Sequence, residues 1–287
     1  RCVGINGVGL MRLTATRTSV TSSGSSGTPS VPSFTLNLNF AESKSLTDSV
    51  SGNNLTTFSR ASSGTYVGSD GLIKTTPVNL LTYSSVDTPG WSAAGAQPTV
   101  IWNGFSDPSG KNEAAEITFA GAVNSQIQQT VSTFTSGVTY TYSLYARVPS
   151  GTQSFLLFRF DGGDFSQQFT ATTSWQRFQW PFVGNGGSSP SVRVRCVSPV
   201  GGEVLLVWGA QLQEGSAATD YIPTGATISG APRFDHDPVT LESLGLLIEE
   251  ERTNVTRPSD FSSLWFYTGS GDGIIQTAYG LAPDGST

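Results

Sequence analysis

The sequence has few charged residues and a single histidine, which excludes several classes of site. Of its 287 residues only 13% are charged, and the formal net charge is −6. Proteins that bind nucleic acid normally present a basic surface, so no nucleic-acid partner is expected. No spacing of zinc ligands, no phosphate-binding loop and no nucleophile elbow occurs. We therefore predict no catalytic and no metal-binding residue, and we interpret the chain as non-enzymatic.

Cysteines and long apolar runs are scarce too. The two cysteines, Cys2 and Cys196, lie far apart and do not indicate a disulfide framework. No apolar run approaches the 18 residues of a membrane-spanning helix, so no membrane insertion is expected. The apolar stretch in residues 1–13 is short and broken by glycines, unlike the centre of a signal peptide. We expect the chain to be a piece of a longer protein.

Glycine, serine and threonine are plentiful, and they separate short apolar runs. The chain has 33 glycines, many of them in turn-forming contexts between segments whose side chains alternate between apolar and polar. This pattern predicts an all-β fold, with residues 76–225 forming an antiparallel β-sandwich of the jelly-roll type. The predicted strands lie near 79–81, 123–132, 138–148, 154–160, 164–171, 174–182, 191–197 and 203–212.

The strand at 203–212 is apolar on both faces. Strict alternation places one set of side chains on one face (Val204, Leu206, Trp208, Ala210) and a second set on the other (Leu205, Val207, Gly209, Gln211). Such a strand is covered on both sides. We expect it to be the last strand of the sandwich, packed beside the first.

The remaining segments suggest a division into parts. Residues 1–33 are predicted to be an attachment segment followed by a flexible Ser/Thr/Gly linker. Residues 34–75 and 226–253 are each interpreted as half of a small β module. Within the first half, strands are predicted at 34–40, 57–59 and 65–67, and Ser69-Asp70-Gly71 predicts a tight turn. Residues 254–287 echo 79–91 and are interpreted as the start of a second, incomplete jelly roll.

Several pieces of residues 75–225 resemble the jelly-roll carbohydrate-binding modules of the type 4/9, galactose-binding-like group. They are Asn79-Leu80-Leu81 with Trp91, VTYTYSLYARV (138–148), SWQRFQWPF (174–182), VLLVWGAQLQEG (204–215) and DYIPT (220–224). The resemblance implies a sandwich that binds sugars. It also permits a structural calcium ion, although no cofactor is predicted from the residues themselves.

A second resemblance lies on either side of the first. Residues 58–75 and 231–254 resemble bacteriophage virion fibre and head-spike proteins, in which the first piece runs almost directly into the second. The jelly roll is therefore interpreted as an insertion into the small β module. The resemblance implies a virion structural protein, such as a tail fibre, head fibre or spike, that displays jelly rolls to host-surface glycans. It further implies a homotrimer joined to other virion proteins through its N-terminal segment.

The alternative is the carbohydrate-binding region of a secreted polysaccharide-degrading enzyme, which would be extracellular.

A glycan site is predicted at Tyr145, Arg147, Arg159 and Gln211. In the strand 138–148 one face carries Tyr140, Tyr142, Leu144 and Ala146, which suit the core, and the other carries Thr141, Ser143, Tyr145 and Arg147. A ring that stacks on a sugar, beside fixed donors for its hydroxyls, is typical of carbohydrate sites. Arg193 and Arg195 are placed on the same surface. The alternative is that Arg147 pairs with a surface carboxylate and the domain is a spacer.

Three further features are interpreted as structural. His236 stands between two aspartates, but Asp237-Pro238 starts turns, so no metal or catalytic role is assigned to it. Asp161 and Asp164 flank two glycines, where a hairpin turn is favoured over a calcium site. The tryptophans Trp91, Trp102 and Trp180 suit a sandwich core better than a ligand site.

Overall fold

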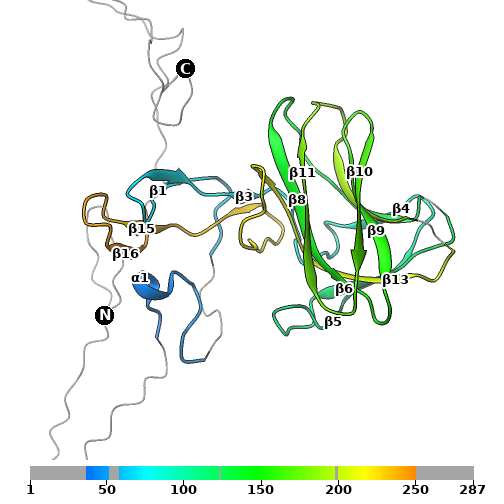
Figure 1. Cartoon of the computed structure of the whole chain (residues 1–287), viewed down its shortest axis with the longest axis horizontal. Coiled ribbons are helices and arrows are strands. Elements are labelled where there is room, and N and C mark those ends of the chain that lie inside the picture. The colour runs from blue at the N-terminus through cyan, green and yellow to red at the C-terminus, as the bar shows by residue number, and fades with distance from the viewer. Residues whose placement is uncertain (1–36, 52–57, 123, 198–199, 250–287) are drawn as a thin grey trace, which may run out of the picture. The chain divides into compact units, whose positions relative to one another are not determined.

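The chain divides into two compact units, Arg1–Ile248 and Glu249–Thr287. The computed structural model describes residues 37–51, 58–122, 124–197 and 200–249, which belong almost entirely to the first unit. In these residues the regular secondary structure is nearly all β-strand, and α1 (Phe40–Ser43) is the one helix (Figure 1). No helix in the described ranges is long and apolar enough to cross a membrane. The prediction of an all-β chain is confirmed.

Ten strands form two five-stranded antiparallel sheets. One, called the β9 sheet, has the order β10-β9-β12-β7-β4, and the other, called the β8 sheet, has the order β11-β8-β13-β6-β5. Figure 1 shows β8 and β11 in one layer and β9 and β10 in the other. This arrangement confirms the predicted sandwich. The bounds are β4 (Ser92–Ala94), β5 (Thr99–Phe105), β6 (Ala114–Thr118), β7 (Gln126–Thr130), β8 (Thr139–Arg147), β9 (Gln153–Phe160), β10 (Asp164–Ala171), β11 (Gln176–Val183), β12 (Ser191–Cys196) and β13 (Val204–Glu214).

The core lies between the two sheets. Tyr140, Tyr142, Leu144 and Ala146 of β8 are at most 2% exposed and belong to one hydrophobic cluster with residues of the β9 sheet. The predicted inward face of this strand is therefore correct. Full burial of each large apolar side chain contributes about 1.5–3 kcal/mol to folding. The tryptophans also follow the prediction, because Trp91 is in the core and Trp102 and Trp180 pack against it.

Strand β13 is central in the β8 sheet, where it pairs with β8 and β6. Its side chains are buried on both faces, as predicted. Strict alternation fails at one point, because the register shifts between Trp208 and Gln211 and Gly209 has φ +65°. This bulge inserts one residue into the strand, and glycine tolerates the left-handed conformation that it requires. Ala210 therefore joins Leu205 and Val207 in the core, whereas the predicted alternation placed it with Trp208 on the opposite face. Gln211 faces outward, as its predicted place on the glycan surface requires.

Six short strands precede or follow the sandwich strands in the sequence and pair as three two-stranded sheets. They are β1 (Thr65–Val67), β2 (Ile73–Thr75), β3 (Val78–Asn79), β14 (Ser229–Gly230), β15 (Phe234–His236) and β16 (Ser243–Leu246). Strands β1 and β2 form a hairpin whose turn contains Ser69-Asp70-Gly71, as predicted, and Gly71 has φ +77°. Strand β14 pairs with β3, and the Val67 amide donates to Asp235 Oδ1 at 2.7 Å. Segments that flank the jelly roll in the sequence are thus in contact.

The predicted strands at 34–40 and 57–59 are wrong in their described residues. Phe40 begins the one-turn helix α1, because Asn39 caps it: the Glu42 amide donates to Asn39 Oδ1 at 3.3 Å and Asn39 Nδ2 donates to Glu42 Oε2 at 2.6 Å. This reciprocal capping outweighs the alternation of apolar residues. Phe58 and Ser59 lie outside any strand. The predicted tether at 1–33 and the repeat at 254–287 lie outside the described residues.

Candidate functional site

Three of the four residues predicted to bind a glycan share one surface. Tyr145 and Arg147 of β8 point outward from the β8 sheet, and Gln211 of β13 lies opposite Ser143 on the same face. Tyr145 and Arg147 are half-buried, whereas Gln211 is fully buried. The outer face of the β8 sheet therefore brings these three residues together but does not leave Gln211 accessible.

Arg159 lies elsewhere, in β9 of the opposite sheet. It is 4% exposed, and its Nη1 is 2.6 Å from Asp161 Oδ2. Its guanidinium also lies 4.6 Å from the centroid of the core ring of Phe182. The Asp161 carboxylate accepts further bonds from the amides of Asn185 and Gly187. The prediction that Arg159 shares a surface with Tyr145 is wrong, because this arginine belongs to a buried ion pair that fastens a neighbouring loop.

The turn between β9 and β10 is a hairpin, as predicted for Asp161-Gly162-Gly163-Asp164. Both oxygens of Asp161 accept bonds from N–H donors, and Asp164, whose side chain is 61% exposed, points to Arg193 at 4.0 Å. In the described part of the chain no three His, Cys, Asp or Glu side chains gather as metal ligands. His236 is 5% exposed, and its Nδ1 lies 3.1 Å from the Val67 carbonyl oxygen, which fits the predicted structural role.

The segment after β13, residues 215–222, covers part of the outer face of the β8 sheet. We call it the tail. Gln211 of β13 is hydrogen-bonded to the tail: its Oε1 accepts the Ile222 amide at 2.8 Å, and its Nε2 donates to the Asp220 carbonyl at 3.3 Å. At the sheet edge, the Ala218 amide donates to Gln179 Oε1 at 2.8 Å. The tail is thus hydrogen-bonded to β13 and to the edge strand β11.

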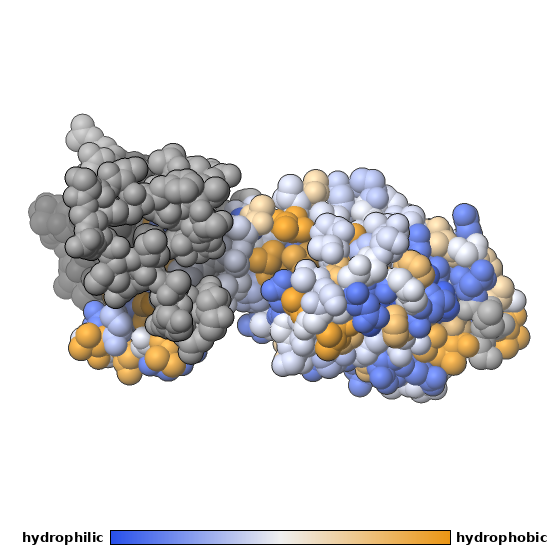
Figure 2. All heavy atoms as spheres, turned by 90° about the horizontal axis from the view of Figure 1, so that it is seen from above, coloured by the Kyte–Doolittle hydropathy of each residue, from blue (hydrophilic) through white to orange (hydrophobic). Residues whose placement is uncertain are grey.

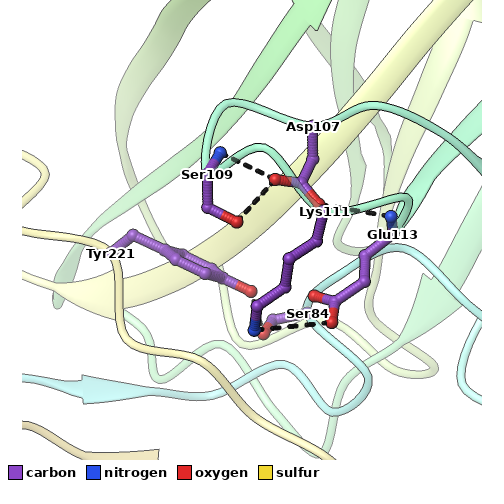
Figure 3. A network of polar contacts seen from close by, with 6 residues as sticks. All are labelled: Ser84, Asp107, Ser109, Lys111, Glu113 and Tyr221. Atoms are coloured by element: carbon purple, nitrogen blue, oxygen red, sulfur yellow. Dashed lines mark hydrogen bonds and ion pairs between the residues drawn. The ribbon is translucent and has the colours of Figure 1, made fainter. Parts of the chain in front are cut away.

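The loop between β5 and β6 covers the same face from the other side. Trp175 Nε1, next to the edge strand β11, donates to the Ser106 carbonyl at 3.2 Å, although Ser106 follows β5 at the opposite edge. Asp107, 3% exposed, closes this loop by accepting bonds from the Ser109 amide at 2.7 Å and the Glu113 amide at 3.2 Å (Figure 3). The loop therefore has a defined conformation.

Tyr221 links the tail to the body of the sandwich. Its hydroxyl lies 2.7 Å from Ser84 Oγ, and Figure 3 shows it in the same polar network as the loop. Burial raises the pKa of Tyr221 well above its ordinary value, and the carboxylates of Glu113 and Asp107 raise it slightly further, while the bond to Ser84 works in the other direction. The neutral phenol is thus the form that fits this position.

Aromatic and arginine side chains on this face pack against one another. The Trp208 ring lies 4.5 Å from Tyr221 and 5.6 Å from Tyr145, and it is 7% exposed. The Arg147 guanidinium lies 5.3 Å from the Trp175 ring, and its Nε has no hydrogen-bond partner among the described residues. This cation–π contact replaces the carboxylate partner that the alternative interpretation predicted for Arg147. We call this outer face of the β8 sheet the covered face.

The outer face of the β9 sheet carries a second group of polar and aromatic residues, which we call the arginine face. The register of β9, β12 and β7 brings Arg193 beside Phe158 and Gln128, and Arg195 beside Gln126. No hydrogen bond among the described residues ties a loop or tail across it. Its members are Gln126 and Gln128 of β7, Phe158 and Phe160 of β9, Ser166 and Gln168 of β10, and Arg193 and Arg195 of β12.

Both arginines of this face are fixed in place. The guanidiniums of Arg195 and Arg193 lie 3.9 Å and 5.3 Å from the centroid of Phe158. Each is oriented through Nε, which donates to Gln126 Oε1 at 2.8 Å from Arg195 and to Ser191 Oγ at 3.0 Å from Arg193. Burial lowers the pKa of both guanidiniums, yet an arginine stays charged in a protein. The Nη groups of Arg195 donate to no described residue.

Sequence reasoning had placed Arg193 and Arg195 beside Tyr145, but they lie on the opposite sheet. The strand SVRVRC did carry the necessary signal, because Val192 and Val194 alternate with the two arginines and face the core. The sequence does not show to which of the two sheets this strand belongs. In the view of Figure 2, apolar residues on the described surface of the sandwich are interspersed with polar ones.

No protein-family model matches the chain, and no curated protein matches its sequence. Solved structures resemble about half of it. The C-terminal family 22 carbohydrate-binding module of Clostridium thermocellum Xyn10B is 18% identical, covers 50% of this chain and 94% of its own, and has a TM-score of 0.41. The CBM22-1 xylan-binding domain of Paenibacillus barcinonensis Xyn10C is 16% identical, with coverages of 50% and 94% and a TM-score of 0.36.

A structure described as a CBM4 module is 14% identical, covers 52% of this chain and 99% of its own, and has a TM-score of 0.36. All three are carbohydrate-binding modules, and none is a bacteriophage fibre. The likeness concerns the jelly-roll fold alone.

Proposed function

We propose that the jelly roll binds carbohydrate, and that it does so through the arginine face. The observation that carries this proposal is the pair of guanidiniums fixed on Phe158 in the middle of an otherwise uncovered sheet face. Amide and hydroxyl side chains surround them on three strands. Fixed donors and acceptors on a rigid sheet are suited to sugar hydroxyls, because little side-chain freedom is lost when the ligand binds.

Binding without cleavage is the activity that this face supports. Glycoside hydrolysis normally uses two carboxylates, one on each side of the scissile bond. Of the described side chains near the arginines, Asp164 is the one carboxylate, and it lies 4.0 Å from Arg193. We therefore infer a binding module and no catalytic centre on this face.

Tyr145 and Arg147 remain a second candidate site for the same ligand class. They lie on the covered face, where Tyr145 packs on Trp208 and Arg147 on Trp175. A tail and a loop are hydrogen-bonded across this face and restrict the room above it. No such bond crosses the arginine face among the described residues, and this difference is the reason for preferring it.

The test compares variants of the full chain on a polysaccharide array. Arg195→Gln removes the charge and the fork of donors on the arginine face, and Arg147→Gln makes the same change on the covered face. We expect the wild type to retain at least one polysaccharide, Arg195→Gln to weaken binding at least tenfold, and Arg147→Gln to bind like the wild type. Circular dichroism checks that each variant folds.

Two outcomes would contradict the proposal in different ways. If Arg147→Gln loses binding and Arg195→Gln does not, the ligand binds on the covered face. If the folded wild type retains no polysaccharide, the jelly roll is not a carbohydrate-binding module.

Both contexts predicted from the sequence, a virion appendage and a secreted enzyme module, could use such a face. In the virion context, residues 1–75 would join the chain to other virion proteins and to two further copies. Peptides of the chain in purified virions would support this context, and peptides in a particle-free culture supernatant would support the enzyme. Sedimentation of the full chain tests the trimer, which a monomer at all concentrations would exclude.

A further inference from the structure

Within the proposed function, on which this inference rests, we propose that the arginine face selects acidic polysaccharides, whose sugars carry carboxylates. The first argument is its charge. Two arginines stand on the face, and the acid beside them, Asp164, lies 4.0 Å from Arg193 with a side chain that is 61% exposed. An exposed pair at this distance contributes little and neutralises the face only in part. The face is therefore locally positive on a chain whose formal net charge is −6.

The second argument is the crowding of two cations on one ring. Both guanidiniums lie over Phe158, at 3.9 Å and 5.3 Å from its centroid. Burial lowers the pKa of Arg195, and the charge of Arg193 lowers it further, while Asp164 offsets part of this effect. Two like charges held close together attract an anion placed between them. A neutral sugar would leave their repulsion unrelieved.

The third argument is the direction of the free donors. Because Nε of Arg195 donates to Gln126 and Nε of Arg193 to Ser191, the orientation of each guanidinium is set from one side. A planar guanidinium with free Nη groups matches the two oxygens of a carboxylate. Successive residues on one face of a strand are about 7 Å apart, so both arginines can reach one carboxylate or carboxylates on adjacent sugars.

The surrounding side chains suit the remainder of a sugar polymer. Gln128 stands on one side of the arginines, and Ser166 and Gln168 stand on the other, on the exposed edge strand β10. Four strands at spacings of about 4.8 Å make the face roughly 14 Å across, which is wider than one sugar ring. Nucleic acid is a poorer fit, because two arginines on an acidic chain give few phosphate contacts.

The experiment uses the full chain and three acidic polymers as probes: polygalacturonate, alginate and hyaluronate. Each is compared with its carboxyl-reduced form, which keeps the backbone and removes the charge. We expect at least one acidic polymer to bind and its reduced form to bind at least tenfold more weakly. Raising the salt from 50 to 200 mM should weaken the acidic interaction several-fold, because added salt shortens the Debye length and screens the attraction between solvent-exposed charges.

Variants at the two arginines separate charge from geometry. Arg193→Gln and Arg195→Gln should each lower affinity for the acidic polymer at least tenfold, with little change for any neutral polymer that binds. Arg195→Lys keeps the charge but loses the planar fork, so an intermediate loss with the salt dependence retained is expected. Lys74→Gln, in the exposed hairpin of β1 and β2, removes one positive charge outside both candidate faces. It is the matched control and should bind like the wild type.

The outcomes distinguish a failure of this inference from a failure of the proposed carbohydrate-binding function on which it rests. If no polysaccharide binds, the proposed function fails and the inference fails with it. The inferred selectivity for acidic polymers is wrong if the carboxyl-reduced polymers bind as tightly as the acidic ones, or if both glutamine variants keep full affinity for the acidic polymer. In either case the proposed carbohydrate-binding function is retained. Equal binding of single-stranded DNA would show a general polyanion surface and would also overturn the inference.

Discussion

The two outer faces of the sandwich contain the same chemical groups in different surroundings. On the covered face Arg147 lies over Trp175, and on the arginine face Arg195 lies over Phe158, at centroid distances of 5.3 Å and 3.9 Å. The first pair lies on a face to which a loop and a tail are hydrogen-bonded, and Trp175 itself donates to the loop. The second is on an open sheet. An arginine on an aromatic ring therefore does not by itself indicate a binding site, because what lies above it decides whether a ligand can approach.

The covering segments come from far away in the sequence. The tail follows β13, and the loop belongs to the hairpin of β5 and β6, whereas the residues that they cover are in β8 and β11. Side-chain alternation within one strand reports which face is polar, but it contains no information about such a cover. The covered face is thus stabilised by contacts that the arginine face lacks, and substitutions should affect the two faces differently.

The largest effect is expected at Asn79, which holds the tail to the sandwich. Its side chain is fully buried, donates to the carbonyls of Ala210 and Ile222 at 3.1 and 2.9 Å, and accepts the amides of Leu81 and Leu212. Asn79→Ala leaves several buried backbone groups without partners, each costing about 1–3 kcal/mol. We expect the free energy of unfolding to fall by about 3 kcal/mol in urea denaturation, with part of the cost relieved by water.

The affinity of Asn79→Ala for polysaccharide should contrast with its loss of stability. Below the unfolding transition, Asn79→Ala should keep its affinity for polysaccharide, because the arginine face is on the other sheet. If the free energy of unfolding falls by less than about 1 kcal/mol, the four hydrogen bonds of the Asn79 side chain do not stabilise the attachment of the tail as expected.

The strands of the sandwich could be predicted where alternation is regular. The predicted strand at 164–171 coincides with β10, and the core side of β8 was identified from Tyr140 and Tyr142. Strand β5 was missed because Asn103 has φ +51° and the register with β6 shifts between Ile101 and Phe105, which obscures the period of two.

The candidate site could be predicted only in part. The sequence indicates that Arg193 and Arg195 share one face of a strand, but the pairing of that strand with β9 and β7 depends on contacts across 30 to 70 residues. Arg159 was misplaced because a charged residue at an inward position is rare unless a partner is buried with it. For its partner, Asp161, the sequence favours a hairpin turn over a calcium site and gives no sign of an ion pair.

Alkaline pH should destabilise the fold through two buried tyrosines. Burial raises the pKa of Tyr142, in the core, and of Tyr221, in the tail against Trp208, above their ordinary values near 10. Above that pH the unfolded chain loses protons that the native state keeps, so stability is full below about pH 10 and falls as the pH rises further. Each tyrosine contributes a slope of about 1.4 kcal/mol per pH unit.

Tyr142→Phe isolates one of these contributions. The Tyr142 hydroxyl has no hydrogen-bond partner among the described residues, so its removal should be neutral or slightly stabilising at pH 7. Urea denaturation between pH 9.5 and 11.5 should then show a shallower decline than in the wild type. An unchanged slope would mean that Tyr142 ionises in the native state.

The smallest effects are expected from two glutamines on the edge strands of the two sheets. Gln179 of β11 accepts the Ala218 amide of the tail at 2.8 Å, whereas the side chain of Gln168 in β10 is exposed beside the arginine face. Gln179→Ala should lower the free energy of unfolding by about 0.5–1 kcal/mol, the usual net value of one hydrogen bond, and leave binding unchanged. Gln168→Ala should stay within about 0.5 kcal/mol in stability, as exposed substitutions do, and weaken polysaccharide binding two- to fivefold. Urea denaturation and isothermal titration on both variants measure the four quantities. If Gln168→Ala binds like the wild type while Gln179→Ala binds more weakly, the ligand contacts the β8 sheet, and the assignment of the open face is reversed.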